Sequence, residues 1–176
     1  MRAMKRTQTA FTLMELMVTL TVMAILCAYA VPSFREYTRD SRASAAHNDL
    51  VTAFNLARSE TLHRGMPIGI CASSNSTDCS GSDDWSNGWI LFTDATGAAS
   101  ALDADDLLLQ AWGGYTDDLT IEGLDGLSAV RYLNTGMIDA AAPAQFELFP
   151  TGCKGDRKRA IEIAVAGSVS YAKTGC

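Results

Sequence analysis

The hydrophobic positions of this chain follow two patterns, and the change between them falls near residue 65. From Phe11 to Val31 the chain has 21 residues with a single charge, Glu15. An α-helix rises about 1.5 Å per residue, so this run is about 30 Å long and matches the hydrocarbon core of a bilayer. We therefore expect residues 11–31 to form an apolar helix that can span a membrane.

The helical pattern continues beyond this run. Apolar residues recur at spacings of three and four on one face: Ala43, Ala46, Leu50, Ala53, Phe54 and Ala57. Pro32 removes one backbone donor and should kink the helix, and Gly65 with Pro67 should end it. Residues 32–64 are thus predicted to form an amphipathic second half of one long helix, with its apolar stripe packed on a domain.

From residue 65 onward, short apolar or alternating runs are separated by turn-rich stretches. The strand candidates are IGICA (68–72), WILFTD (89–94), DLLLQAW (106–112), LTIEGL (119–124), AVRYLN (129–134), QFELFP (145–150), RAIEIAV (159–165) and SVSYAK (168–173). Residues 165–169, with Gly167, resemble a hairpin turn that joins the last two. The pattern predicts an α+β fold in which a long N-terminal helical spine packs on an antiparallel β-sheet domain spanning residues 65–176.

Charge narrows the range of partners. The chain has 14 Lys and Arg against 20 Asp and Glu, a formal net charge of −6, and three of the cations precede the apolar run. An acidic net charge argues against non-specific binding of nucleic acid, because such binding depends on contacts between cations and phosphates. The basic residues ahead of the apolar run favour a cytoplasmic N-terminus and an exported remainder.

The cysteines point to an oxidising compartment. Cys27 lies in the apolar run, and the other four, Cys71, Cys79, Cys153 and Cys176, follow it without CxxC or zinc-type spacing. Sequential pairing, Cys71–Cys79 and Cys153–Cys176, would close two short loops. Four cysteines allow three connectivities, and spacing alone does not choose among them.

The N-terminal segment has two interpretations. A secretory signal cleaved after a small-x-small site at Ala28 and Ala30 is one of them. Two observations oppose it. A charge such as Glu15 inside an apolar segment costs about 2–3 kcal/mol on insertion scales and is usually retained for a function, and the helical pattern continues past Pro32.

The short basic leader followed by AFTLMEL, a hydrophobic run and a proline resembles the class III signal of type IV pilins and type II secretion pseudopilins. The resemblance implies that a prepilin peptidase cuts residues 1–10 away between Ala10 and Phe11 and methylates the new N-terminus at Phe11. Alanine stands at position 10 where the family usually has glycine. Because alanine is nearly as small, we expect processing.

Cleavage at this site would explain Glu15. The cut creates an α-amine at Phe11, and a carboxylate four residues along a helix can lie near that amine or near the equivalent amine of another subunit. Buried charges are tolerated when they are paired, so Glu15 would set the register between subunits. The alternative is a carboxylate that only sits at the membrane surface in the first helical turn.

The order of elements beyond the spine is similar to the GspH/FimT family, with the Trp-x-x-Gly-Trp block of Trp85, Gly88 and Trp89 as its best marker. The resemblance implies a minor type IV pilin of the FimU or FimT type, held in the inner membrane with its N-terminus in the cytoplasm and then incorporated into an extracellular pilus, at or near the tip. Its partners would be other minor and major pilins. A type II secretion minor pseudopilin of the H type is the alternative.

A run of cations near the C-terminus suggests a further role. Lys154, Arg157, Lys158 and Arg159 resemble the Gly-Arg-x-Arg motif of FimT-type pilins that take up DNA, interrupted by Asp156. Such a patch would give weak, salt-sensitive DNA binding. The competing interpretations are a solubilising charge run and a contact with an acidic subunit.

No catalytic constellation is apparent, and we expect no enzymatic activity, no cofactor and no metal site. His47 and His63 lack a nucleophile or metal-ligand partner at useful spacing, so we interpret them as surface or packing residues. The acidic stretch with Asp94, Asp103, Asp105 and Asp106 lacks the spacing of an EF-hand loop, and we predict a solvated loop there.

Overall fold

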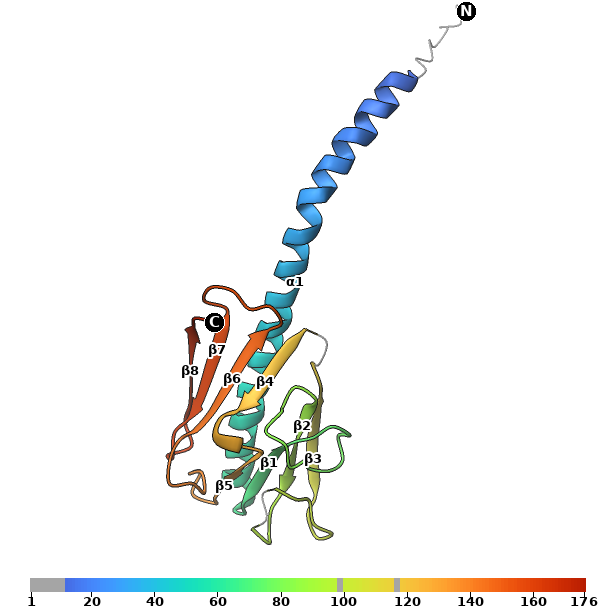
Figure 1. Ribbon diagram of the computed structural model, residues 1–176. Coiled ribbons are helices and arrows are strands. Elements are labelled where there is room, and N and C mark those ends of the chain that lie inside the picture. The colour runs from blue at the N-terminus through green and yellow to red at the C-terminus, as the bar shows by residue number, and fades with distance from the viewer. Residues whose placement is uncertain (1–11, 98–99, 116–117) are drawn as a thin grey trace, which may run out of the picture. The chain divides into compact units, whose positions relative to one another are not determined.

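A single helix opens the described part of the chain, and eight strands follow it (Figure 1). The computed structural model describes residues 12–97, 100–115 and 118–176. The helix α1 (Leu13–Arg64) contains Pro32 and is followed by Gly65, whose φ of 68° suits a residue without a side chain. The predicted long helix is confirmed.

The chain divides into two units, Met1–Thr38 and Arg39–Cys176. Of the first unit, the structure describes residues 12–38, which belong to α1. The second unit holds the rest of α1, from Arg39 to Arg64, together with every strand. Most of the predicted amphipathic half of the helix, residues 39–64, therefore belongs to the same compact unit as the sheets.

The strands form two antiparallel sheets of four strands each. The first has the order β3 (Leu108–Gly113), β2 (Gly88–Thr93), β1 (Ile68–Ala72) and β5 (Ala129–Tyr132). The second has the order β4 (Leu119–Gly123), β6 (Ala144–Pro150), β7 (Lys158–Ile163) and β8 (Val169–Thr174), and the short 3-10 helix η1 (Leu124–Gly126) follows β4. This arrangement confirms the predicted α+β fold with antiparallel sheets.

The main core lies between the second part of α1 and both sheets. The predicted apolar stripe of the helix is buried throughout, and Phe54 packs against Trp85 and Phe146 with ring centroids 6.1 and 5.1 Å apart. Ile121 of β4 and Ile161 of β7 belong to the same cluster. The helix thus supplies one wall of the core, and the alternating strands supply the other.

The two middle strands of the first sheet, β1 and β2, are covered on both faces. Every residue of β1 and β2 is buried, which explains why their sequences are continuous apolar runs rather than alternating ones. A second, smaller cluster of Cys71, Ile90 and Phe92 fills the face away from the main core. Cys79, on the loop after β1, packs against this cluster, so the loop serves as a cover for the sheet.

The Trp85–Trp89 block connects the two sheets. The backbone N–H of Trp85 donates to the carbonyl of Ile121 in β4 at 2.8 Å, and its indole Nε1–H donates to the carbonyl of Leu127 at 2.8 Å. Gly88 has a φ of 120°, and a Cβ there would lie 2.5 Å from the carbonyl oxygen of Trp112. This glycine lets the chain pass from the junction between the sheets directly into β2.

The last two strands form the predicted hairpin. The N–H of Gly167 donates to the carbonyl of Ala164 at 2.7 Å, and Gly167 has a φ of 79° that favours glycine. β8 pairs with β7 alone and is an edge strand of its sheet.

Candidate assembly surfaces

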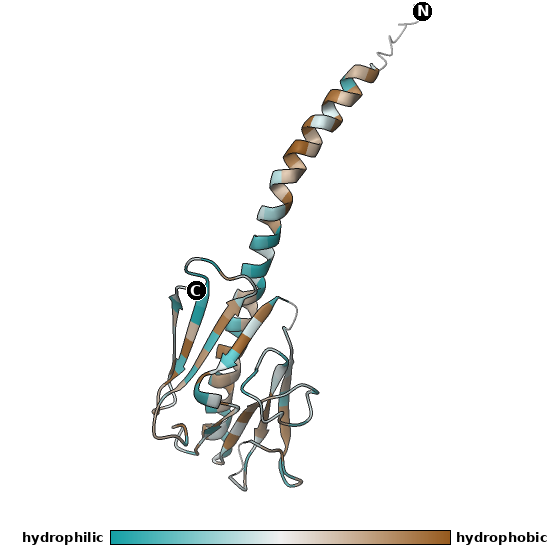
Figure 2. Cartoon of the chain, viewed as in Figure 1, coloured by the Kyte–Doolittle hydropathy of each residue, from teal (hydrophilic) through white to brown (hydrophobic). Residues whose placement is uncertain are grey.

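The first described part of α1 is an exposed apolar segment. From Leu13 to Val31 every residue is exposed. Figure 2 shows mostly brown and pale residues along the N-terminal turns of α1 and several teal residues further along the helix. Within the described residues, α1 is the one helix that is long and apolar enough to cross a membrane. The free Cys27 is exposed on this segment.

Glu15 is the acidic residue of the first turn of α1. The hydroxyl of Thr12 accepts a hydrogen bond from the backbone N–H of Glu15 at 3.2 Å, which is the geometry of a side-chain N-cap. Thr12 and Glu15 have the spacing of a capping box, and a carboxylate in this turn also interacts favourably with the helix dipole. Ala10 and Phe11, the predicted cleavage residues, lie outside the described residues.

Both short cysteine loops are closed by disulfides. Cys71 is joined to Cys79, and Cys153 to Cys176, with Cα–Cα distances of 5.6 and 5.8 Å. Of the three possible connectivities, the sequential one is the one present. The first disulfide holds the loop that covers β1, and the second ties the chain end after β8 to the loop before β7.

The predicted cation cluster is divided between a loop and a strand. Lys154 is exposed on the loop, but Lys158 belongs to β7, where its Nζ lies 2.6 Å from Glu147 Oε2. Arg159 is only 5% exposed, and its Nη2 donates to Ser44 Oγ at 2.8 Å and to Asp40 Oδ1 at 3.3 Å. The prediction that Arg159 lies in an exposed cation patch is wrong, because this side chain packs on α1.

The alternation of buried and partly exposed residues along β7 predicts that Arg159 is buried. Arg159 is in phase with Ile161 and Ile163, so its side chain lies on the same buried face of the strand. The sequence predicts Arg159 both as the first residue of the strand candidate 159–165 and as a member of the cation run, and the structure confirms the strand.

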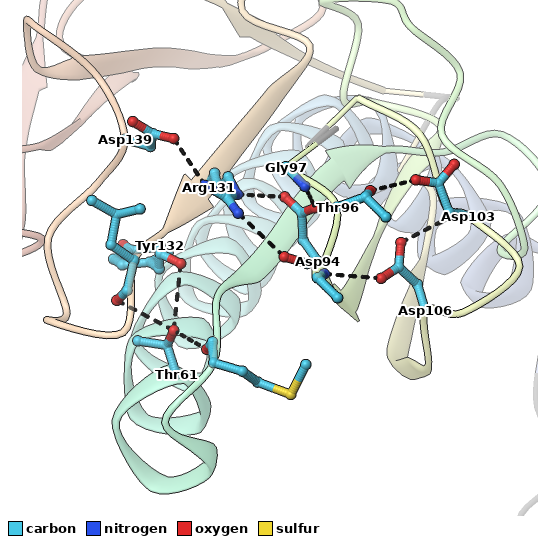
Figure 3. Close-up of polar contacts among 12 residues, drawn as sticks. Thr61, Asp94, Thr96, Gly97, Asp103, Asp106, Arg131, Tyr132 and Asp139 are labelled. Carbon is cyan, nitrogen blue, oxygen red and sulfur yellow. Dashed lines mark hydrogen bonds and ion pairs between the residues drawn. The ribbon is translucent and has the colours of Figure 1, made fainter.

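Asp94 is fully buried, so the predicted solvated loop is wrong for this residue. Its Oδ2 accepts a hydrogen bond from Arg131 Nε at 2.7 Å, and its Oδ1 accepts one from the N–H of Gly97 at 2.8 Å (Figure 3). Arg131 also donates to Asp139 at 3.0 Å. Burial acts to lower the pKa of Arg131, but these two carboxylates outweigh it and raise that pKa.

The acidic loop after Asp94 is held by its own hydrogen bonds. Asp106 accepts from the N–H groups of Ala95 and Asp103 at 3.2 and 3.0 Å, and Thr96 donates to Asp103 at 2.5 Å (Figure 3). These carboxylates organise the loop. Over residues 12–97, 100–115 and 118–176, no group of three or more side chains is arranged to hold a metal ion.

The two histidines differ in their surroundings. His63 is exposed near the end of α1. His47 is 7% exposed, and its ring meets Tyr171 edge-on with centroids 4.9 Å apart. Burial and then the positive charge of Arg159 lower the pKa of His47. His47 is a packing residue between α1 and β8.

Further ion pairs and a phenol–carboxylate contact join α1 to residues between β3 and β4, and sequence reasoning missed them. Asp118 lies 3.2 Å from Arg39 Nε and 2.9 Å from Arg42 Nη1, and Tyr115 donates to Asp49 at 2.5 Å. Burial, followed by the hydrogen bond and the charge of Asp49, raises the pKa of Tyr115 to about 12. These partners are more than 60 residues apart along the chain, and no local pattern pairs them.

Comparison with solved structures identifies proteins of the same fold. The type IV minor pilin FimU of Pseudomonas aeruginosa is similar in two crystal forms. The first form gives a TM-score of 0.57 at 22% identity and covers 73% of this chain and 91% of that chain. The second gives a TM-score of 0.61 at 20% identity and covers 77% of this chain and 92% of that chain. The minor pseudopilin EpsH from the type 2 secretion system of Vibrio cholerae gives a TM-score of 0.51 at 13% identity, covering 75% of this chain and 97% of that one.

Two family models match the chain, while a comparison with curated proteins finds no match. The model described as "Prokaryotic N-terminal methylation motif" matches residues 5–31, which include the apolar segment and Glu15. The model described as "Type II transport protein GspH" matches residues 46–167, more than half of the chain. With its spine helix, its two antiparallel sheets and this match, the chain belongs to the GspH family of minor pilins and pseudopilins.

Proposed function

We propose that this chain is a minor pilin of the FimU or FimT type, made as a membrane-anchored precursor and incorporated into a type IV pilus at or near its tip. The observation that carries the proposal is the exposed apolar segment of α1, which holds one carboxylate, Glu15, in its first turn. An exposed apolar helix of this length needs lipid or the helices of other subunits around it.

Assembly would follow processing. A prepilin peptidase would cut between Ala10 and Phe11 and methylate the new terminus, so that the Phe11 amine lies near Glu15 or near the glutamate of a neighbouring subunit. Within the described residues, Glu15 has no ion-pair partner, and an unpaired charge in an apolar segment costs about 2–3 kcal/mol. A neighbouring amine would remove this cost and fix the register.

Pro32 lies inside α1, between the apolar segment and the part that packs on the sheets. A proline removes one backbone hydrogen bond from the helix interior, so it marks a place where the helix bends at lower cost. In the proposed filament this position would let the apolar segment adjust to its neighbours while the sheet domain faces outward.

The H-type pseudopilin of type II secretion is the second candidate. Such a pseudopilin would use the same apolar segment of α1 and the same Glu15 carboxylate, but it would assemble in the type II secretion system. The description of the matching family model and the similar fold of EpsH favour it. DNA uptake has weaker support, because Lys158 and Arg159 are engaged with Glu147 and Asp40.

Deletion of the gene followed by complementation tests these alternatives. We expect deletion to reduce surface piliation, and we expect the wild type and Glu36→Gln, but not Glu15→Gln, to restore it. Glu36→Gln is the matched control, because it makes the same change at an exposed position of α1 outside the apolar segment. Normal piliation with lost protein secretion would reject the pilus and support the pseudopilin; normal piliation and normal secretion would reject both.

A further inference from the structure

A groove of about 180 Å³ lies between α1 and the last two strands. Its lining combines three residues of α1, one of β7 and three of β8: Ser44, His47, Asn48, Arg159, Tyr171, Ala172 and Lys173. The whole groove is part of the unit Arg39–Cys176.

Arg159 is the most deeply placed charge in this groove. One of its terminal nitrogens, Nη2, is held by Ser44 and Asp40. The other, Nη1, is buried and has no hydrogen-bond partner among the described residues. Buried guanidinium N–H groups in folded proteins are almost always bonded to an acceptor, because leaving one unpaired costs free energy. Arg159, which lines the groove, therefore keeps an unsatisfied N–H donor among the described residues.

The charges around the groove favour an anionic acceptor. Arg159 and Lys173 are both positive, and the carboxylate of Asp40, which is about half exposed, bonds Nη2 rather than Nη1. His47 also lines the groove with its Nδ1 buried and unpaired among the described residues. Because its pKa is lowered by burial and by Arg159, His47 does not add a further proton near neutral pH.

The groove borders a free sheet edge. β8 pairs with β7 on one side only, so the backbone groups of its other edge are open to an added strand. Tyr171 is 68% exposed on this strand, although its ring packs against His47. An extended peptide along such an edge places alternate side chains toward one face of the sheet, here the face that carries the groove.

We propose that the groove between α1 and β8 receives an aspartate or glutamate side chain of a neighbouring pilin subunit, whose extended segment lies along the edge of β8 and whose carboxylate accepts a hydrogen bond from Arg159 Nη1. This inference rests on the proposed role as a filament subunit. A carboxylate matches the planar guanidinium, and one side chain can enter a groove of this size. The phosphates of a DNA duplex need surface cations, and Arg159 is not one.

Site-specific photocross-linking in cells tests the proposal with the full chain. A p-benzoylphenylalanine is introduced at position 171, where the native residue is an exposed aromatic, and adducts in sheared filaments are mapped by mass spectrometry. The expected adduct is a peptide of another pilin subunit that contains Asp or Glu near the cross-linked position.

Two substitutions on α1 make the test specific. Asn48→Glu adds a carboxylate to the groove itself, and we expect it to reduce the adduct at least about fivefold, since an internal acceptor competes for Arg159. Asn55→Glu is the matched control: it makes the same change at an exposed position two turns further along α1, does not line the groove, and should leave the adduct unchanged.

The outcomes separate this inference from the proposed function. If the chain is present in filaments but position 171 gives no adduct, gives an adduct with nucleic acid, or gives an adduct that both substitutions affect equally, the groove is not a carboxylate site and the filament role stands. If the chain is absent from filaments while it accumulates in the membrane, both proposals are overturned.

Discussion

Replacement of Asp94 by asparagine tests the ion pair that anchors the loop after β2. The substitution keeps the shape of the side chain but removes the charge that faces Arg131 Nε at 2.7 Å. Asp94 is fully buried, and the Arg131 side chain is 16% exposed. Removing one partner of a buried ion pair costs about 3–5 kcal/mol, because the other charge is left without compensation.

The structure places the expected cost at the lower end of this range. Arg131 keeps Asp139 as a second partner at 3.0 Å, so its charge still has an ion-pair partner after the substitution. We expect Asp94→Asn to lower the free energy of unfolding by about 3 kcal/mol. For a unit of this size, about 3–4 °C of Tm corresponds to 1 kcal/mol, so the Tm should fall by about 10 °C.

Thermal unfolding of the full chain in detergent, followed by near-ultraviolet circular dichroism of the buried Trp85 and Trp89, measures this change. Asp139→Asn is the matched control. Its carboxylate is 53% exposed, and exposed ion pairs contribute less than about 1 kcal/mol. If Asp94→Asn destabilises the protein no more than Asp139→Asn does, the buried pair does not anchor the loop and the argument from burial fails.

Three further predictions concern stability. Burial and then Asp49 raise the pKa of Tyr115 to about 12, so the folded state favours the neutral phenol. The resulting contribution to the free energy of unfolding is complete below pH 10 and is lost as the pH rises from 10 to about 12. Unfolding midpoints measured over this pH range should show the loss in the wild type and not in Tyr115→Phe. The pKa of His47 is lowered from 6.5, so stability should fall as the pH drops below 6.5, and His47→Gln should flatten that fall in denaturant titrations. Loop-closure entropy predicts that Cys79→Ser lowers the free energy of unfolding by about 2.5 kcal/mol and Cys176→Ser by about 3.4 kcal/mol, because the second disulfide closes the longer loop. A larger decrease for Cys79→Ser in urea unfolding would contradict this prediction.

The sequence predicted the elements because their periods are simple. The stripe from Ala43 to Ala57 is buried as its spacing of three and four requires, and the continuous runs of β1 and β2 are buried on both faces. The turn with Gly167 follows from its position between two alternating segments. Each of these predictions depends on residues close together in the chain.

The charged contacts could not be predicted in the same way. Arg159 meets Asp40 across 119 residues, and Arg131 meets Asp94 across 37, so their pairing depends on how helix and sheets pack. A run of cations indicates exposure only while it lies in a loop. Arg159 belongs to β7, where alternate side chains point to the same face of the sheet. It therefore lies on the buried face together with Ile161.

Mass spectrometry of sheared surface filaments, which determines the mature N-terminus of the chain, tests whether the subunit assembles through α1. We expect the chain to be present in these filaments and its first residue to be N-methylated Phe11, with Glu15 four residues along. A chain that begins at Val31, after cleavage at the small-x-small site of Ala28 and Ala30, would lack the apolar segment. That result, or absence of the chain from the filaments, would contradict a subunit that assembles through α1.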